Sequence, residues 1–141
     1  MIAVILAGGK GSRLGSLTKA TPKPMIKIAG KPILWHILKI LSSQGIKEFI
    51  ICLGYKGDVI KKYISELNFD FKVKCINTGQ NTLTARRIFL IKNEIHSDRF
   101  LMTYGDGVSD INISKLIKLH NKKKKIATVT AVNPIPRFGS L

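Results

Sequence analysis

Short apolar runs alternate with longer amphipathic segments along the chain. Five of the short runs are rich in Val, Ile and Phe and are bounded by Gly, Asn or Asp, which is typical of strands. These runs predict strands at residues 2–6, 48–53, 71–76, 99–103 and 126–132.

The longer segments repeat apolar residues three and four positions apart, and this spacing indicates amphipathic helices. In the first of them, Ile33, Ile37 and Ile40 fall on one stripe. Pro32 precedes this stripe and Gly45 follows it, as is common at the start and end of a helix. The spacing predicts helices at residues 33–43, 59–67, 83–93 and 113–121.

Strands that alternate with helices predict an α/β fold, in which a mostly parallel sheet carries helices on both faces. Ligands of such sheets bind at the carboxyl ends of the strands, where the connecting loops meet. The 141 residues fit one domain, and no internal repeat or linker divides them. The candidate binding loops are therefore residues 7–24, 54–58, 77–82 and 104–110.

The charge balance predicts anionic partners. The chain has 24 Lys and Arg against 8 Asp and Glu, a formal net charge of +16. Nucleic acid, an acidic membrane and small phosphorylated substrates all satisfy this charge, which does not choose among them. A 45% share of apolar residues argues against disorder, and no apolar run approaches the roughly 20 residues that span a bilayer. We expect a cytoplasmic protein without a membrane partner.

Cysteine and histidine residues offer little chemistry. Cys52 and Cys75 each lie in an apolar run and are expected to be buried free thiols. His36, His96 and His120 have no spacing that brings two ligands to one face, so a zinc site has little support.

A glycine-rich loop follows the first expected strand. Its sequence is Ala7-Gly-Gly-Lys-Gly-Ser-Arg-Leu14. Closely spaced glycines leave backbone N–H groups open to a phosphate chain, although a tight turn is the plainer interpretation of Gly-Gly alone. The loop is not a Walker loop, because Gly11 follows Lys10 where Ser or Thr is needed. It is not a dinucleotide fingerprint either, because Leu14 occupies the place of the third glycine.

Two cations flank these glycines. Arg13 offers a bidentate fork to phosphate oxygens, and Lys23 is a compact point charge held between Pro22 and Pro24. A lysine between prolines loses little further freedom when it binds an anion. The pair indicates a polyphosphate site; the alternative for Arg13 is an exposed residue that caps the loop.

The segment from Leu6 to Leu14, with Thr18 and Pro22-Lys-Pro-Met25, resembles the signature loop of the sugar-1-phosphate nucleotidyltransferases. Further stretches resemble the branch of that family that transfers a cytidylyl group to glucose 1-phosphate. These stretches are residues 30–37, 49–57, 77–84 and 102–108. The resemblance covers nearly the whole chain but only the front part of the family's domain.

The resemblance implies a Rossmann-like sheet of the glycosyltransferase-A type. It also implies a reaction in which the phosphate of a sugar 1-phosphate attacks the α-phosphate of CTP and releases pyrophosphate. Arg13 would hold the departing pyrophosphate, Lys23 would neutralise the α-phosphate, and Asp106 would bind Mg²⁺. The residues that would bind the nucleotide are Leu6, Ala7, Gly8, Gly9, Gly11, Ser12, Thr82, Arg87 and Gly105.

Each assignment has a plainer alternative. Asp106 would form an Asx turn within Gly-Asp-Gly, and Arg87 would be an exposed helix residue beside Arg86. Trp35 and His36 are expected to pack or cap rather than touch a substrate.

The chain departs from the family in three places. Ala85 and Arg86 stand where the family usually has two glycines, so an arginine there would obstruct a ligand or add an anion contact. The family also has a longer segment between the parts that match Ile64 and Phe71. Finally, the chain ends where the family's domain continues into its sugar-binding half, which supplies a second metal-binding aspartate. We expect the first part of a larger domain.

Three functions remain open from the sequence. The first is a transferase that uses CTP, a sugar 1-phosphate and Mg²⁺, with another base or choline phosphate as variants. The second is a catalytically incomplete fragment that binds a nucleotide. The third is a nucleic-acid binder, which has the charge but lacks a recognised module, with only 7% aromatic residues to stack on bases. A homo-oligomer like those of the family is left open.

Overall fold

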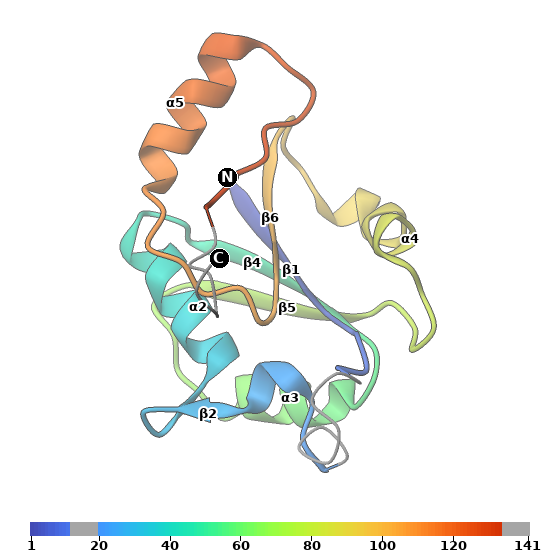
Figure 1. Cartoon of the computed structure of the whole chain (residues 1–141). Coiled ribbons are helices and arrows are strands. Elements are labelled where there is room, and N and C mark those ends of the chain that lie inside the picture. Colours follow the sequence, from blue (N-terminus) through green and yellow to red (C-terminus); the bar gives the residue numbers. More distant parts are fainter. Residues whose placement is uncertain (12–19, 134–141) are drawn as a thin grey trace, which may run out of the picture. The chain divides into compact units, whose positions relative to one another are not determined.

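The computed structural model describes residues 1–11 and 20–133 (Figure 1). The chain divides into two units, residues 1–110 and 111–141. The first unit contains β1 (Ile2–Ala7), the 3-10 turn η2 (Lys23–Met25), β2 (Lys27–Ile28), β3 (Lys31–Pro32), α2 (Ile33–Ser43), β4 (Glu48–Leu53), α3 (Gly57–Ser65), β5 (Lys72–Asn77), α4 (Thr84–Leu90), the 3-10 turn η3 (Lys92–Glu94) and β6 (Phe100–Tyr104). The second contains α5 (Ile113–Lys123).

A four-stranded parallel sheet organises the first unit, in the order β5-β4-β1-β6. Leu6 of β1 pairs with Cys52 of β4 on one side and with Tyr104 of β6 on the other. The chain builds outward from β1 to β4 and β5, and then returns to the free side of β1 to form β6. The predicted parallel α/β sheet is confirmed, and the side on which successive strands are added changes between β5 and β6, which leaves β1 and β6 as neighbours at the point of reversal.

Helices cover both faces of this sheet, as the sequence predicts. Right-handed crossovers place α2 and α3 on one face and α4 on the opposite face (Figure 1). On the α4 face, alternate residues of the central strands form a buried cluster that is completed by the segment following α4. The cluster consists of Val4, Leu6, Ile50, Cys52 and Ile91. This core fixes the positions of the strand ends that carry the site.

The element bounds follow local chemistry. Helix α2 has the predicted bounds, and Gly45 beyond its end takes φ of +92°. Helix α3 begins at Gly57, two residues before the prediction, because Lys56 adopts a left-handed conformation and turns the chain into the helix early. The predicted helix at 83–93 is divided into α4 and η3. Ile91 lies between these two elements and is fully buried. The apolar spacing that predicted one continuous helix therefore marks residues that pack in the core, although the helix itself is interrupted.

The strand predicted at residues 126–132 is wrong. The structure places these residues in irregular backbone, with Ile126 fully exposed and Val129 and Val132 86% and 74% exposed. A strand exists only where a neighbour completes its hydrogen bonds, and no described strand pairs with this segment. A segment rich in β-branched residues does not form a strand without such a neighbour.

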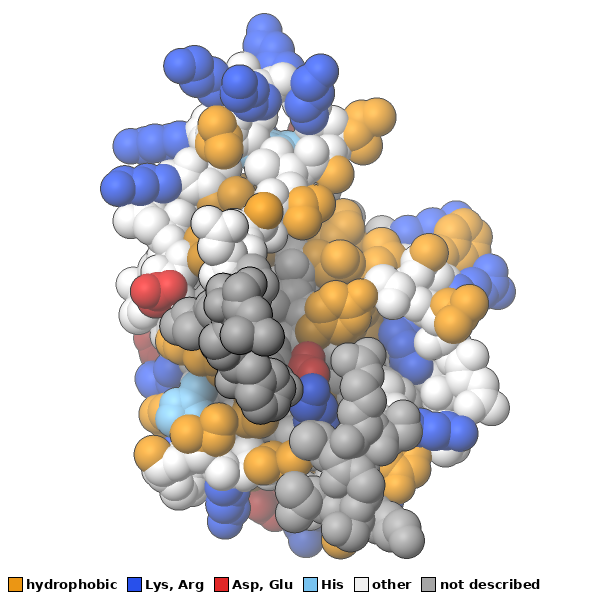
Figure 2. Space-filling model, viewed as in Figure 1, with side chains coloured by type: hydrophobic (Ala, Val, Ile, Leu, Met, Phe, Trp, Pro, Cys, Tyr) orange, Lys and Arg blue, Asp and Glu red, His pale blue; other side chains and the backbone are white. Residues whose placement is uncertain are grey.

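Helix α5 is the main element of the second unit. Asn112 caps it, accepting a hydrogen bond from the backbone N–H of Lys115 at 2.9 Å, and Lys124 ends it in a left-handed conformation. Figure 2 shows Lys and Arg side chains gathered around the end of this helix. None of the helices in the described ranges has the length and apolar character that crossing a membrane requires.

Candidate functional site

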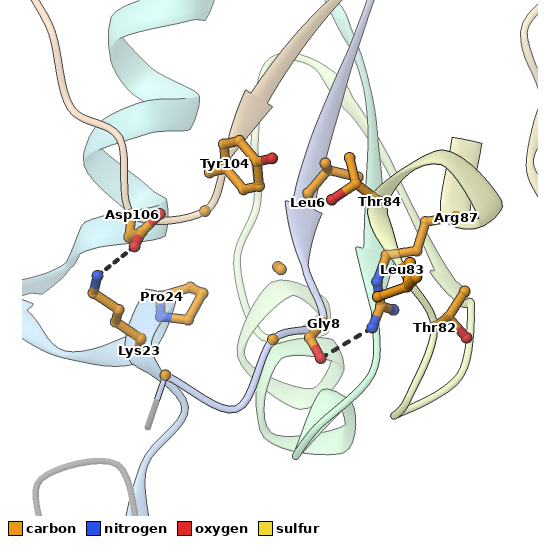
Figure 3. Close-up of a pocket in the computed structure, with 14 residues that line it drawn as sticks. Leu6, Gly8, Lys23, Pro24, Thr82, Leu83, Thr84, Arg87, Tyr104 and Asp106 are labelled. Carbon is orange, nitrogen blue, oxygen red and sulfur yellow. Dashed lines mark hydrogen bonds and ion pairs between the residues drawn. The ribbon is translucent and has the colours of Figure 1, made fainter. Parts of the chain in front are cut away.

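A cavity of about 350 Å³ lies at the carboxyl ends of β1 and β6 (Figure 3). This is where the strand order reverses, and open parallel sheets bind their ligands at such a point, beyond the carboxyl ends of the strands. The cavity wall contains every predicted site residue that the structure describes. These are Leu6, Ala7, Gly8, Gly9, Gly11, Lys23, Thr82, Arg87, Gly105 and Asp106. Arg13 and Ser12 lie outside the described residues.

One wall of the cavity carries an ion pair between Lys23 of η2 and Asp106, just after β6 (Figure 3). Their side chains are 36% and 33% exposed, so both charges remain accessible to a solute. The turn at Asp106 is closed by the backbone, since the Gly107 N–H donates to the Tyr104 carbonyl at 3.3 Å. The Asp106 carboxylate instead faces Lys23, so the Asx-turn alternative does not describe it.

Gly105 allows the two halves of this ion pair to meet. A Cβ on Gly105 would lie 2.9 Å from Cγ of Pro24 and 3.2 Å from Cβ of Ala7. Because this position has no side chain, the turn that carries Lys23 packs directly against the end of β6. The glycine at this position is thus explained by packing within the protein.

Arg87 forms the opposite wall, and its side chain is only 5% exposed. Its Nη1 donates to the Leu53 carbonyl at 3.0 Å and to Oγ1 of Thr78 at 2.6 Å, and its Nη2 donates to the Gly8 carbonyl at 3.2 Å. The guanidinium therefore joins the ends of β1, β4 and β5 to α4. The alternative of an exposed helix residue is wrong, because the α4 spacing turns Arg87 inward while Arg86 stays exposed.

Burial also changes the acid–base properties of this wall. It lowers the pKa of the Arg87 guanidinium from its usual value. It raises the pKa of the neighbouring Cys52 thiol to about 11, and the Arg87 charge only partly opposes this rise. Burial likewise raises the pKa of Cys75. Both cysteines are free thiols, as predicted, but only Cys52 is buried; Cys75 is half-buried, so the predicted burial is wrong for it. The raised pKa of each thiol argues against an activated nucleophile.

The glycines of the first loop serve different purposes. A Cβ on Gly8 would overlap the Arg87 guanidinium, so this glycine makes room for a protein side chain. A Cβ on Gly9 would meet no described atom within 4 Å, and Gly9 is exposed at the cavity wall. Gly11 takes φ of +65°, which favours glycine. Of Gly8 and Gly9, therefore, Gly9 is the one that leaves space unfilled by the described residues.

The structure adds wall residues that were not among the predicted ligand-binding residues. They are Pro24, Leu83, Thr84 and Tyr104, of which Leu83 and Tyr104 are exposed apolar side chains. Tyr104 begins one of the loops expected to bind ligand, and its pairing with Leu6 would have placed it beside the first loop. Leu83 has no comparable signal, because it lies one residue beyond the expected binding loop 77–82 and falls in the helix predicted at 83–93; the structure makes it the residue before α4.

Ala85 and Arg86 do not belong to the described wall of the cavity. Arg86 lies over the ring of Phe89, with its Cζ 5.1 Å from the ring centroid. The effect of this arginine on a ligand, obstruction or an added anion contact, stays a prediction.

The described residues contain no group of three His, Cys, Asp or Glu side chains that could hold a metal ion. Asp106 is the carboxylate of the cavity wall. A single carboxylate suits Mg²⁺ when substrate phosphates and water provide the other oxygens. The cavity wall therefore fits a metal ion that Asp106 and the phosphates of a bound polyphosphate would hold together.

Comparison with known proteins connects this site to a family. The family model described as nucleotidyl transferase matches residues 2–140. The chain is 43% identical to a probable glucose-1-phosphate cytidylyltransferase of Bacillus subtilis and 44% identical to a glucose-1-phosphate cytidylyltransferase of Salmonella typhimurium. Both alignments cover all of this chain and 64% of the relative, so the chain spans less than two thirds of these proteins' length.

A solved structure shares the fold. It is HddC from Yersinia pseudotuberculosis complexed with GMP-PN, which superposes with a TM-score of 0.75 at 34% identity. The match covers 84% of this chain and 53% of that one. Together with the family match over nearly every residue, the parallel sheet and the glycine-loop cavity show that the chain belongs to the nucleotidyl transferase family.

Proposed function

We propose that the protein transfers a cytidylyl group from CTP to glucose 1-phosphate and releases pyrophosphate. The observation that carries this proposal is the cavity between β1 and β6, in which open glycine backbone faces the Lys23–Asp106 pair. The choice of CTP and glucose 1-phosphate comes from the two relatives that bear that activity in their names.

The chain's own groups can perform much of this chemistry by position and charge. The attacking phosphate oxygen is already ionised, so the protein has to align two anions and stabilise the charge that develops between them. Lys23 lies at the cavity wall with an accessible ammonium and neutralises the α-phosphate in this proposal. The backbone around Gly9 and Gly11 binds the phosphate chain, with Arg13 assigned to the pyrophosphate.

Asp106 would hold Mg²⁺ together with the phosphates of the nucleotide. When bound, the metal would supply charge stabilisation at the phosphate oxygens. Asp106 now pairs with Lys23, so the Lys23 ammonium would become available to the phosphates if the Asp106 carboxylate held Mg²⁺. With the nucleotide bound, Lys23 would thus contact the α-phosphate and Asp106 would contact Mg²⁺.

A second candidate is nucleotide binding without transfer. It is favoured by the wall of the described cavity, in which Asp106 is the one acidic residue, so that the described residues offer a bound metal a single carboxylate. The phosphate loop and the ion pair are complete in this candidate, whereas the acceptor sugar has no assigned residues.

Pyrophosphate release separates the two candidates. The chain is incubated with CTP, glucose 1-phosphate and Mg²⁺, and CTP binding is measured in parallel by calorimetry. Transfer predicts release that is lost in Lys23→Ala and Asp106→Ala, whereas binding without release supports the second candidate. Release that persists in both variants, or absence of CTP binding, contradicts both candidates.

Base choice needs its own measurement, because the HddC structure was obtained with GMP-PN. Thermal shift with CTP, GTP, dTTP and UTP ranks the bases, since a ligand that binds only the folded chain raises its stability. We expect the largest shift with CTP. An equal or larger shift with GTP would reassign the base.

A further inference from the structure

The described structure places a buried arginine beneath the glycine loop with only neutral oxygens as hydrogen-bond acceptors. Arg87 donates to two backbone carbonyls and one hydroxyl. The Thr78 hydroxyl in turn donates to the Leu53 carbonyl at 2.8 Å, so these groups form one connected network. Such charge-assisted hydrogen bonds are stronger than neutral ones and hold their acceptors in fixed orientations.

The loop end of this network is the Gly8 carbonyl. It accepts from Arg87 (Figure 3) and also from the Tyr55 N–H at 3.1 Å, so two donors hold this oxygen. A trans peptide directs its C=O and N–H to opposite sides. The N–H of Gly9 therefore points away from Arg87, and Gly9 belongs to the cavity wall.

The peptide between Gly8 and Gly9 is unusually free to reorient, because glycine on both sides allows positive and negative φ equally well. Its two orientations have opposite effects on an anion. One presents an N–H donor to phosphate oxygens, and the other presents a carbonyl oxygen that repels them. Without a hold on the Gly8 carbonyl, the loop would sample both.

We propose that Arg87 is a positioning residue that locks the Gly8–Gly9 peptide in the orientation that offers the Gly9 N–H to a phosphate. It acts through the Gly8 carbonyl, and this role is separate from the direct nucleotide contact that the resemblance implies for Arg87. Gly8 must lack a side chain for this purpose, because a Cβ there would overlap the guanidinium. The identity of the phosphate ligand rests on the proposed function; the hydrogen-bond lock does not.

Amide hydrogen exchange of the whole chain tests the lock without any ligand. Three amides are compared in Arg87→Met: those of Tyr55 and Thr78, which donate to acceptors shared with Arg87, and that of Gly105, which donates to the Leu6 carbonyl at 2.9 Å. We expect roughly tenfold faster exchange at Tyr55 and Thr78 and an unchanged rate at Gly105. An unchanged rate at Tyr55, or equal acceleration of all three amides, would overturn the proposal.

Arg86→Met is the matched control, since it removes the same charge from the adjacent exposed position. It should leave all three amide rates unchanged. If Arg87→Met does not fold, Arg87→Lys replaces it, because one ammonium cannot reach the three acceptors together. The same pattern of exchange is then expected, and its absence counts against the lock.

CTP titration tests the consequence for binding. Arg87→Lys should weaken CTP binding at least about tenfold although it keeps the charge, while Arg86→Met retains the wild-type affinity. Faster exchange at Tyr55 with unchanged CTP affinity would overturn the positioning role. If the wild-type chain binds no CTP, the proposed function fails, and the exchange pattern alone decides whether Arg87 locks the peptide.

Discussion

The two cationic walls of the cavity differ in burial and in partners. Arg87 is 5% exposed and donates only to neutral oxygens, whereas Lys23 is about one third exposed and pairs with a carboxylate. A buried charge held by several hydrogen bonds costs much to disturb, while an exposed ion pair exchanges its partners with solvent and solutes. We therefore call the Arg87 side the scaffold wall, because it stabilises the fold. We call the Lys23–Asp106 side the receiving wall, because its charges are accessible to a ligand.

The largest effect is expected where the scaffold wall is broken. Arg87→Met removes three charge-assisted hydrogen bonds and leaves the buried ends of β1, β4 and β5 without their shared donor. We expect the free energy of unfolding to fall by about 3 kcal/mol. Urea denaturation measures this change. Arg86→Met should stay within about 0.5 kcal/mol of wild type, and a similar loss there would remove the contrast.

Gly8→Ala attacks the same wall from the loop side. The added methyl overlaps the guanidinium, and we expect a loss of about 2 kcal/mol in urea denaturation. In the Arg87→Met background the flexible methionine can yield, so the cost of Gly8→Ala should be less than half as large. Additive losses in the double variant would show that the overlap with Arg87 is not the cause.

The receiving wall should show the opposite balance between stability and binding. Lys23→Met breaks only an exposed ion pair, so the free energy of unfolding should fall by less than about 1 kcal/mol. CTP affinity measured by calorimetry should nevertheless weaken at least about tenfold, because a charge-assisted phosphate contact is lost. A stability loss as large as that of Arg87→Met would place Lys23 in the scaffold.

Gly9→Ala sharpens the comparison within the loop. A Cβ there meets no atom of the described residues within 4 Å, so the unfolding free energy should stay within about 0.5 kcal/mol of wild type. CTP affinity should still fall, because the methyl group occupies space that we assign to the phosphate chain. Unchanged CTP affinity would mean that the ligand does not approach Gly9.

The smallest effect is expected in the titration of Cys52, which reports on the Arg87 charge. Burial raises the thiol pKa from its ordinary 9 to about 11, so the folded state holds this proton more tightly than the unfolded state. Its contribution to stability is complete below pH 9 and is lost as the pH rises to about 11. Because Arg87 lowers this pKa, Arg87→Met should raise it further; the pH dependence of alkylation, followed by mass spectrometry, would show this. A fall in the pKa would contradict it.

Several features were predictable from local pattern. The periods of two and of three to four residues encode which faces are buried, and they correctly predicted the parallel sheet, its helices and the bounds of α2. The loops at the strand ends could be located for the same reason. The strand predicted at 126–132 failed because a strand also needs a partner, which its own residues do not provide.

The sequence by itself determined the class of fold, the glycine loop and the types of charged residue available to it. Only the tertiary structure decided which charges act together. Lys23 and Asp106 are 83 residues apart in the chain, and Arg87 reaches a carbonyl 79 residues away. Whether a cation is buried scaffold or an accessible binding group depends on contacts between distant segments, and no periodicity within a segment records those contacts.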